Sequence, residues 1–148
     1  MRKRTQAREF ALQILYQRDL NPEPQETLLG SFWETHPAPP EVREYTERLV
    51  QGSLLHLNEI DGVISKYAEH WEIHRMAVVD RTILRFATYE LLYIEEVPPK
   101  VVINEAVNMA KKFSQEESGK FVNGILDKIN HTEARRKEGG LTPSRDPL

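Results

Sequence analysis

The sequence has no cysteine among its 148 residues, and this absence excludes disulfides, thiolate metal sites and cysteine nucleophiles. It also lacks any apolar run approaching the ~20 residues that a membrane-spanning helix needs, and no signal-peptide apolar region follows its basic beginning. We therefore expect a cytoplasmic protein with no membrane contact. Enzymatic patterns are missing too, because there is no glycine-rich phosphate loop, nucleophile elbow or HExxH sequence. The sequence thus predicts a protein that is not an enzyme and that uses no cofactor.

A strong charge of one sign is also lacking. The net charge is −3 and charged residues make up 29% of the chain, so no overall basic field favours nucleic acid. Arg2, Lys3, Arg4 and Arg8 nevertheless gather within the first eight residues. Arg4 and Arg8 are four apart, which predicts that both project from one face of a helix. This basic cluster is either a phosphate-binding surface or only a solubilising start.

The dominant pattern in the sequence is helical periodicity of the apolar residues. Three amphipathic patterns follow one another between Val79 and Ile129, and they are separated by Pro98-Pro99 and by a short break near Ser114. Four weaker helical patterns precede them, and strand-like alternation is absent. The sequence predicts an all-α fold of six to seven helices in two packed three-helix subdomains. The expected boundaries are a single domain over 1–133, with an N-terminal bundle of about 1–70 and a C-terminal bundle of about 71–133, followed by a flexible tail over 134–148.

A few polar, aromatic and glycine positions allow more than one interpretation. His70 and His74 have the spacing of a metal-binding pair, but no carboxylate motif accompanies them, so surface histidines are favoured and no metal site is predicted. Gly124 lies inside a helical pattern, which indicates a close approach of two helices. Phe121 follows Lys120 and is either a core residue or a ring that stacks on a base of single-stranded RNA.

Four segments together carry a resemblance to a known family. They are AREFALQILYQ at 7–17, VDRTILRFATYEL at 79–91, VPPKVVINEAVNMAKKF at 97–113 and GKFVNGILDKI at 119–129. In order, spacing and chain length they resemble the transcription antitermination factor NusB family. The resemblance covers nearly all of the chain before residue 134, and it is weakest between Pro22 and Val42.

The resemblance implies a fold of two three-helix bundles and a non-enzymatic role in transcription antitermination. It implies binding of boxA-type single-stranded RNA together with the small-subunit ribosomal protein NusE, within an antitermination complex on RNA polymerase that acts in ribosomal RNA synthesis. The RNA-binding residues that it implies are Arg2, Lys3, Arg4, Arg8, Tyr16, Glu105, Lys120, Phe121 and Asn123. The partner-binding candidates are Tyr67, His74 and Asp80, although Asp80 is also a candidate helix cap or ion-pair partner of Arg81.

Two other functions stay open at this point. One is an RNA-recognition domain of the kind fused to RNA cytosine methyltransferases, and the other is a helical adaptor that binds proteins without contacting RNA. The sequence also leaves open whether the free protein forms a homodimer.

Overall fold

The computed structural model describes residues 2–69 and 72–136, and within these ranges it is all-helical. The described elements are α1 (Lys3–Leu20), α2 (Gln25–Thr35), α3 (Pro40–Leu55), α4 (Leu57–Tyr67), the short 3-10 helix η1 (Ile73–Arg75), α5 (Val78–Tyr93), α6 (Pro99–Phe113) and α7 (Glu116–Thr132). The predicted all-α class is confirmed. None of the described helices is long and apolar enough to cross a membrane.

Prolines begin two of the helices. Pro40 and Pro99 occupy first-turn positions of α3 and α6, where the missing N–H has no intrahelical partner to lose. The residues before them, Pro39 and Pro98, have extended backbones, as expected for a residue that precedes proline. The proline pairs therefore separate the helices and set where α3 and α6 start.

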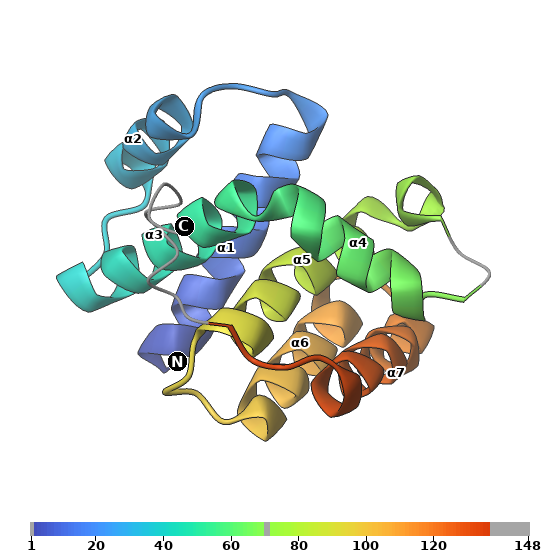
Figure 1. Ribbon diagram of the computed structural model, residues 1–148. Helices are drawn as coiled ribbons and strands as arrows, with labels where there is room; N and C mark the ends of the chain where they lie inside the picture. Colours follow the sequence, from blue (N-terminus) through green and yellow to red (C-terminus); the bar gives the residue numbers. More distant parts are fainter. Residues whose placement is uncertain (1, 70–71, 137–148) are drawn as a thin grey trace, which may run out of the picture.

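Helix α5 forms the centre of the molecule. It packs against α1, α3, α4, α6 and α7, and Figure 1 shows it between the α1 and α3 pair and the α6 and α7 pair. Twelve of its sixteen residues are buried, so this helix has almost no solvent-facing side. A helix surrounded in this way is expected to be apolar throughout. The buried Glu90 near its C-terminal end is therefore an exception that needs a partner.

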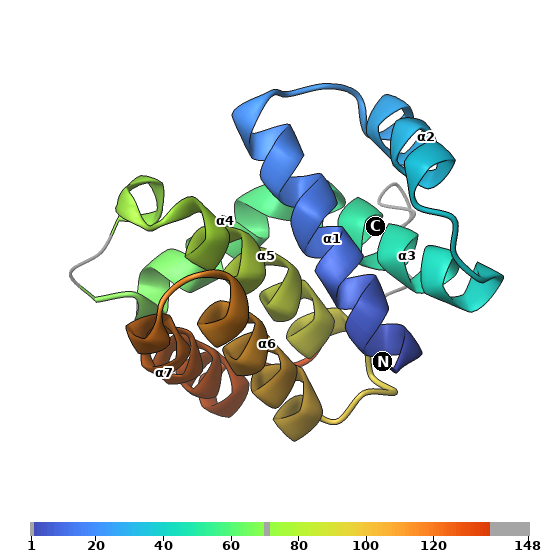
Figure 2. The ribbon, with the colours of Figure 1, turned by 180° about the vertical axis from the view of Figure 1, so that it is seen from behind.

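One buried hydrophobic cluster includes residues from all seven α-helices. The most extensive pairings join α6 to α7 and α1 to α3, with α5 shared between them (Figure 2). The division into bundles of about 1–70 and 71–133 stays a prediction.

Close helix approach occurs at a glycine other than the expected one. No atom lies within 4 Å of where a Cβ on Gly124 would be, so the prediction for that position is wrong. At Gly52 in α3, a Cβ would lie 2.0 Å from Cζ of Tyr89 in α5. The Tyr89 ring therefore occupies the space that a side chain at position 52 would fill.

The residues that follow α7 pack back onto the fold. Arg135 donates hydrogen bonds to the carbonyl oxygens of Ile94 and Val97, and the Arg136 backbone N–H donates to the Leu92 carbonyl oxygen at 2.7 Å. Arg135 and Arg136, in the first part of the predicted flexible tail, are thus attached to the end of α5 and to the segment that follows it. Its remaining part, 137–148, lies outside the described residues.

Candidate nucleic-acid interface

The basic N-terminal cluster lies where α1 meets the beginnings of α3 and α6. Figure 2 shows the N-terminal end of α1 beside the loop that leads into α6. The side chains of Arg2, Lys3 and Arg4 are all exposed there. They line two adjoining hollows of about 430 and 370 Å³, one toward α6 and one toward α3. The α6 side adds Val97, Pro98, Val101 and Glu105, and the α3 side adds Glu41, Glu44, Tyr45 and Arg48. We call these two hollows together the N-terminal groove.

Arg8 departs from the sequence prediction. Its side chain is only 3% exposed, because residues of α3, α5 and α6 surround it, whereas Arg4 lies one turn closer to the end of the helix. The prediction that Arg4 and Arg8 project together from one exposed face is therefore wrong for Arg8. Its guanidinium instead donates to both carboxylate oxygens of Glu90, with Nε at 2.9 Å from Oε1 and 3.1 Å from Oε2. Glu90 is itself 1% exposed, so the pair is fully buried beneath the N-terminal groove.

A tyrosine completes the coordination of Glu90. The Tyr45 hydroxyl in α3 donates to Oε2 of Glu90 at 2.6 Å. Burial and the neighbouring carboxylate raise the pKa of Tyr45, so the hydroxyl stays a donor. Burial by itself lowers the pKa of Arg8, but the hydrogen bonds and charge of Glu90 outweigh it and raise that pKa. Arg8 therefore keeps its positive charge, and the contacts among Arg8, Glu90 and Tyr45 link α1, α3 and α5.

The same arginine extends this network to the floor of the groove. Nη1 of Arg8 donates to Oε1 of Glu105 in α6 at 3.0 Å, and the Thr5 hydroxyl donates to the same oxygen at 2.7 Å. The Glu105 side chain is 15% exposed and also lines the N-terminal groove. Arg8 thus fixes the position of Glu105, which the sequence had placed on the RNA path.

The exposed cations have weaker partners. The Arg4 guanidinium carbon lies 4.9 Å from the centroid of the Tyr45 ring, and Nζ of Lys3 lies 3.2 Å from a carboxylate oxygen of Glu41. Arg2 has no ion-pair partner among the described residues. Exposed pairs of this kind contribute little stability. Their charges are therefore available to a polyanion.

Arg48 and Glu96 form the outer edge of the groove on the α3 side. Nη1 of Arg48 lies 2.6 Å from Oε2 of Glu96, and this hydrogen bond lowers the pKa of Glu96 to about 2. Glu96 is therefore ionised at neutral pH and bound to an arginine. This edge of the groove consequently contributes little net charge.

The other predicted RNA-binding residues occupy different parts of the surface. Tyr16 lies in the second half of α1 and is 38% exposed. Lys120 and Asn123 are exposed and three residues apart on α7, so they share one face. Phe121 is half-buried and packs against the core, so part of its ring stays exposed and its role in RNA stacking stays a prediction.

Phe121 also lines a hollow of about 310 Å³ with Asp80, one of the predicted partner-binding residues. Asp80 is 8% exposed and its Oδ2 accepts a hydrogen bond from the Ser118 hydroxyl at 3.0 Å. It is neither the N-cap of α5, which is Ala77, nor the partner of Arg81, which pairs with Asp19. Both structural alternatives for Asp80 are therefore wrong, and its carboxylate joins α5 to the start of α7.

The three partner-binding candidates are not all neighbours. His74 is exposed in η1, close in sequence to Asp80. The Tyr67 hydroxyl, however, donates to Glu133 just beyond the C-terminal end of α7 at 2.7 Å. Asp80 contacts Ser118 at the other end of that helix. Fifteen residues at 1.5 Å each separate these contact points by about 22 Å along the axis, so one small contact area does not contain both.

Only His74 of the histidine pair lies among the described residues. His70 lies outside the described residues, and the part of the chain that is described contains no group of three side chains able to hold a metal ion.

Sequence reasoning missed Glu90, Tyr45 and Thr5, the three residues that hold the floor of the groove. One signal was available, because Glu90 is an acidic residue inside the apolar stretch FATYELLY. An ionised group in such a stretch requires a partner of opposite charge, which the sequence does not identify.

Comparisons with known proteins agree with this fold. The NusB family model matches residues 5–131. The "Transcription antitermination protein NusB" of Anaeromyxobacter sp. (strain Fw109-5) is 46% identical over 144 residues, which is 97% of this chain and 94% of that protein. The structure of Thermotoga maritima NusB, described as "T. maritima NusB, P3121, Form 2", has a TM-score of 0.82 and 39% identity, covering 88% of this chain and 92% of that one. A structure described as "Crystal Structure of Antitermination Factors NusB and NusE in complex with dsRNA" has a TM-score of 0.80 and 35% identity, covering 88% of this chain and 98% of that one.

Proposed function

The chain belongs to the NusB family, and we propose that it binds boxA-type single-stranded RNA together with the small-subunit ribosomal protein NusE. As a member of a family of transcription antitermination proteins, it is a transcription factor and not an enzyme. The complex with NusE and RNA then acts on RNA polymerase, notably during ribosomal RNA synthesis.

The N-terminal groove is the observation that supports this proposal most directly. Three exposed cations line it on a protein whose net charge is −3. They suit phosphate groups, while Val101 and Pro98 offer apolar surface to a base. Glu105, held by Arg8 and Thr5, presents a carboxylate that accepts hydrogen bonds from the amino groups of bases.

Three cations alone bind RNA weakly at physiological salt. A second RNA-contacting surface on a partner raises affinity by making part of the binding intramolecular. The neighbour solved with NusE and double-stranded RNA supports NusE as that partner. We assign the partner surface to the hollow lined by Asp80 together with the exposed His74 of η1. We assign Lys120, Phe121 and Asn123 to the RNA path on α7, where Phe121 also borders that hollow.

One titration tests the proposal. Labelled boxA RNA and a scrambled RNA of equal length are titrated with the full chain, alone and with a saturating amount of NusE. We expect weak binding of both RNAs alone, and selective tightening for boxA when NusE is present. Binding of NusE without any RNA binding in either arm would favour the adaptor function instead.

The partner surface needs its own variant. Because Asp80 is buried, Asp80→Lys places an unpaired charge inside the protein and does not separate folding from binding. Asp80→Asn keeps the shape and removes the charge, and His74→Ala changes an exposed neighbour. Both are expected to weaken the complex with NusE while the helical circular dichroism is retained. Lys128→Ala, a change on the exposed face of α7, serves as the control and leaves that complex intact.

A further inference from the structure

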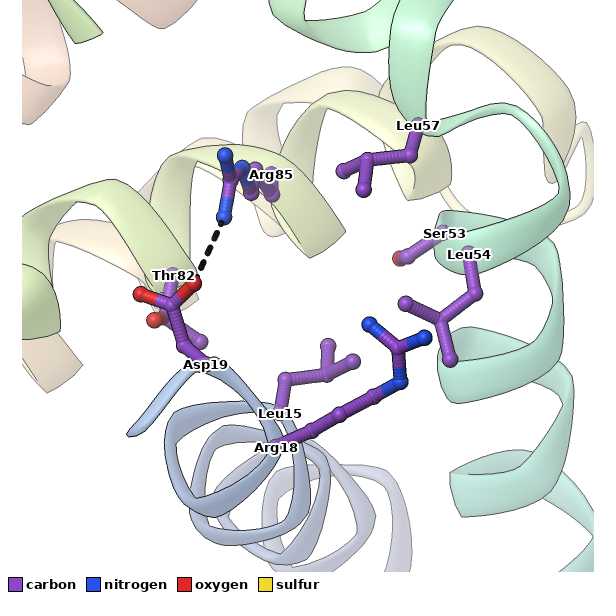
Figure 3. A pocket seen from close by; sticks show the side chains of 8 residues that line it. All are labelled: Leu15, Arg18, Asp19, Ser53, Leu54, Leu57, Thr82 and Arg85. Carbon is purple, nitrogen blue, oxygen red and sulfur yellow. Dashed lines mark ion pairs between the residues drawn. The ribbon is translucent and has the colours of Figure 1, made fainter. Parts of the chain in front are cut away.

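A second polar cavity lies at the opposite end of the helices that carry the Arg8–Glu90 pair. It has a volume of about 100 Å³ and is enclosed by the C-terminal half of α1, the end of α3, the start of α4 and the first half of α5. Figure 3 shows its lining residues, which are Leu15, Arg18, Asp19, Ser53, Leu54, Leu57, Thr82 and Arg85. A volume of this size holds about three water molecules or one small ion.

The charges around the cavity do not balance. The Arg85 guanidinium is paired with Asp61 by hydrogen bonds of 2.8 and 2.9 Å and lies 3.6 Å from an oxygen of Asp19. The other oxygen of Asp19 is bound by Arg81. Arg18 has no ion-pair partner among the described residues, although its guanidinium points into the cavity (Figure 3). The residues that line the cavity therefore include two guanidinium groups, those of Arg18 and Arg85, and one carboxylate, that of Asp19, which leaves one positive charge in excess.

The arginine is also incompletely hydrogen-bonded. Its Nε atom is buried and has no acceptor among the described protein groups. Arg18 as a whole is half-buried, but a buried N–H without an acceptor is costly, so an acceptor in front of it is favoured and an anion is the strongest one. Since both nearby carboxylates are already bound by Arg81 and Arg85, the fold itself supplies no anion for Arg18.

A buried hydroxyl faces the same space. Ser53 is 1% exposed, and its Oγ atom has no hydrogen-bond partner among the described protein groups. In Figure 3 this oxygen points into the cavity, on the same side as the Arg18 guanidinium. A hydroxyl donates one hydrogen bond and an arginine several, so the two together form a donor set for an oxygen-rich anion. Thr82, on the opposite wall, already donates its hydroxyl to the Val78 carbonyl oxygen.

We propose that this cavity binds a small tetrahedral oxyanion of the phosphate class, held by Arg18 and Ser53. The volume admits one such ion and excludes a nucleotide, so the ligand is a free ion rather than a phosphate of the RNA chain. The bound ion connects α1 and α3 at the end opposite the Arg8–Glu90 pair. Binding to the folded state alone then stabilises the arrangement of these two helices.

Thermal unfolding and NMR of the full chain test the proposal at constant ionic strength. Sodium phosphate replaces sodium chloride stepwise, and the amide signals of Ser53 and Thr82 are followed. We expect a saturable rise of the unfolding midpoint, by about 3–6 °C at ten times Kd for a chain of this size. Arg18→Gln is expected to abolish the rise and Ser53→Ala to reduce it. Lys128→Gln, which removes the same charge from an exposed position outside the cavity, keeps the rise.

Two further measurements distinguish a free ion from a phosphate of RNA, and binding in this cavity from binding in the N-terminal groove. A 5′-phosphorylated trinucleotide is not expected to shift the Ser53 and Thr82 signals, because it does not fit the cavity. Three results would each overturn the proposal. The free ion could bind only near Arg2 to Arg4, the rise of the unfolding midpoint could be the same in Arg18→Gln, or the natural protein could show no saturable rise. A shift of the Ser53 signal by the trinucleotide but not by the free ion would also overturn it. If Arg18→Gln fails to fold, Ser53→Ala and the wild-type NMR titration still decide.

Discussion

The guanidinium of Arg8 and the carboxylate of Glu90 form a buried, bidentate ion pair between the first helix and the central one. Both side chains are almost completely withdrawn from water, and Tyr45 and Glu105 add one hydrogen bond each to the pair. The pair couples the core to the floor of the N-terminal groove. Any change in its charge is therefore expected to affect both the stability of the fold and the shape of the groove.

Glu90→Gln is expected to lower the free energy of unfolding by about 3–5 kcal/mol, because it removes the bidentate counter-ion of the buried Arg8 charge and leaves only the single contact with Glu105. Urea unfolding followed by circular dichroism measures the loss. Glu69→Gln, which removes an exposed carboxylate, is the control and is expected to change stability little. The double variant Arg8→Met with Glu90→Met should lose less than Glu90→Gln alone. An equal or larger loss in the double variant would show that packing, and not an uncompensated charge, is the dominant effect.

Gly52→Ala is expected to destabilise the protein by about 1–3 kcal/mol, because the new methyl group overlaps the Tyr89 ring. Gly124→Ala is expected to raise the free energy of unfolding by up to about 1 kcal/mol, since its added Cβ contacts no atom of a neighbouring element and alanine favours the helix. Urea midpoints of the two variants provide the comparison. Equal effects at both positions would contradict the close contact between α3 and α5.

The three exposed cations of the N-terminal groove predict a weak salt dependence of RNA binding. With about 0.7 counterions released per phosphate contact, the log–log slope for single-stranded RNA should be near −2. Arg4→Ala is expected to flatten the slope by about 0.7 and to weaken boxA and scrambled RNA alike, because phosphate contacts carry no sequence information. Lys128→Ala removes the same charge from the surface of α7 and should leave the slope unchanged. If Arg4→Ala leaves the slope unchanged, the basic cluster does not bind phosphates and only makes the start of the chain more soluble.

Phe121 is half-buried, so Phe121→Ala should cost less stability than the about 3–5 kcal/mol typical of a fully buried ring. If the exposed part of the ring stacks on a base, RNA affinity falls by about 1–3 kcal/mol as well. Phe113→Ala is a matched control, since that ring is 41% exposed on α6. Fluorescence titration with NusE present and urea unfolding together separate the two effects. Equal loss of RNA affinity in both variants would remove the specific role of Phe121.

The hydrogen bonds of Glu133 predict that the folded protein loses stability in acid. Hydrogen bonds from Tyr67 and Lys66 lower the pKa of Glu133 to about 2, compared with about 4.5 for a free side chain. A carboxylate with a lowered pKa stabilises the folded state fully above pH 4.5, and this contribution is lost as the pH falls toward 2. Glu133→Gln should therefore reduce the difference between the urea midpoints at pH 5 and pH 3. The same difference in the variant and the natural protein would exclude this carboxylate as a source of acid sensitivity.

The sequence by itself determined the helices and the family. Apolar periodicity and the Pro98-Pro99 break predicted the three C-terminal helices, because helix formation depends on neighbours three and four residues away. The same patterns indicated the NusB family and an all-α fold, and both are confirmed.

Only the tertiary structure decided which polar groups meet. Arg8 and Glu90 are 82 residues apart, and no local rule indicates that one compensates the other. The same holds for the packing along α1, which buries Arg8 and leaves Arg4 in solvent near the end of the helix, and for the close approach at Gly52 rather than Gly124. The physical reason is that burial and ion pairing depend on which helices pack together. Helical spacing sets the faces of a helix, but the packing of the other helices around α5 decides which face is withdrawn from water.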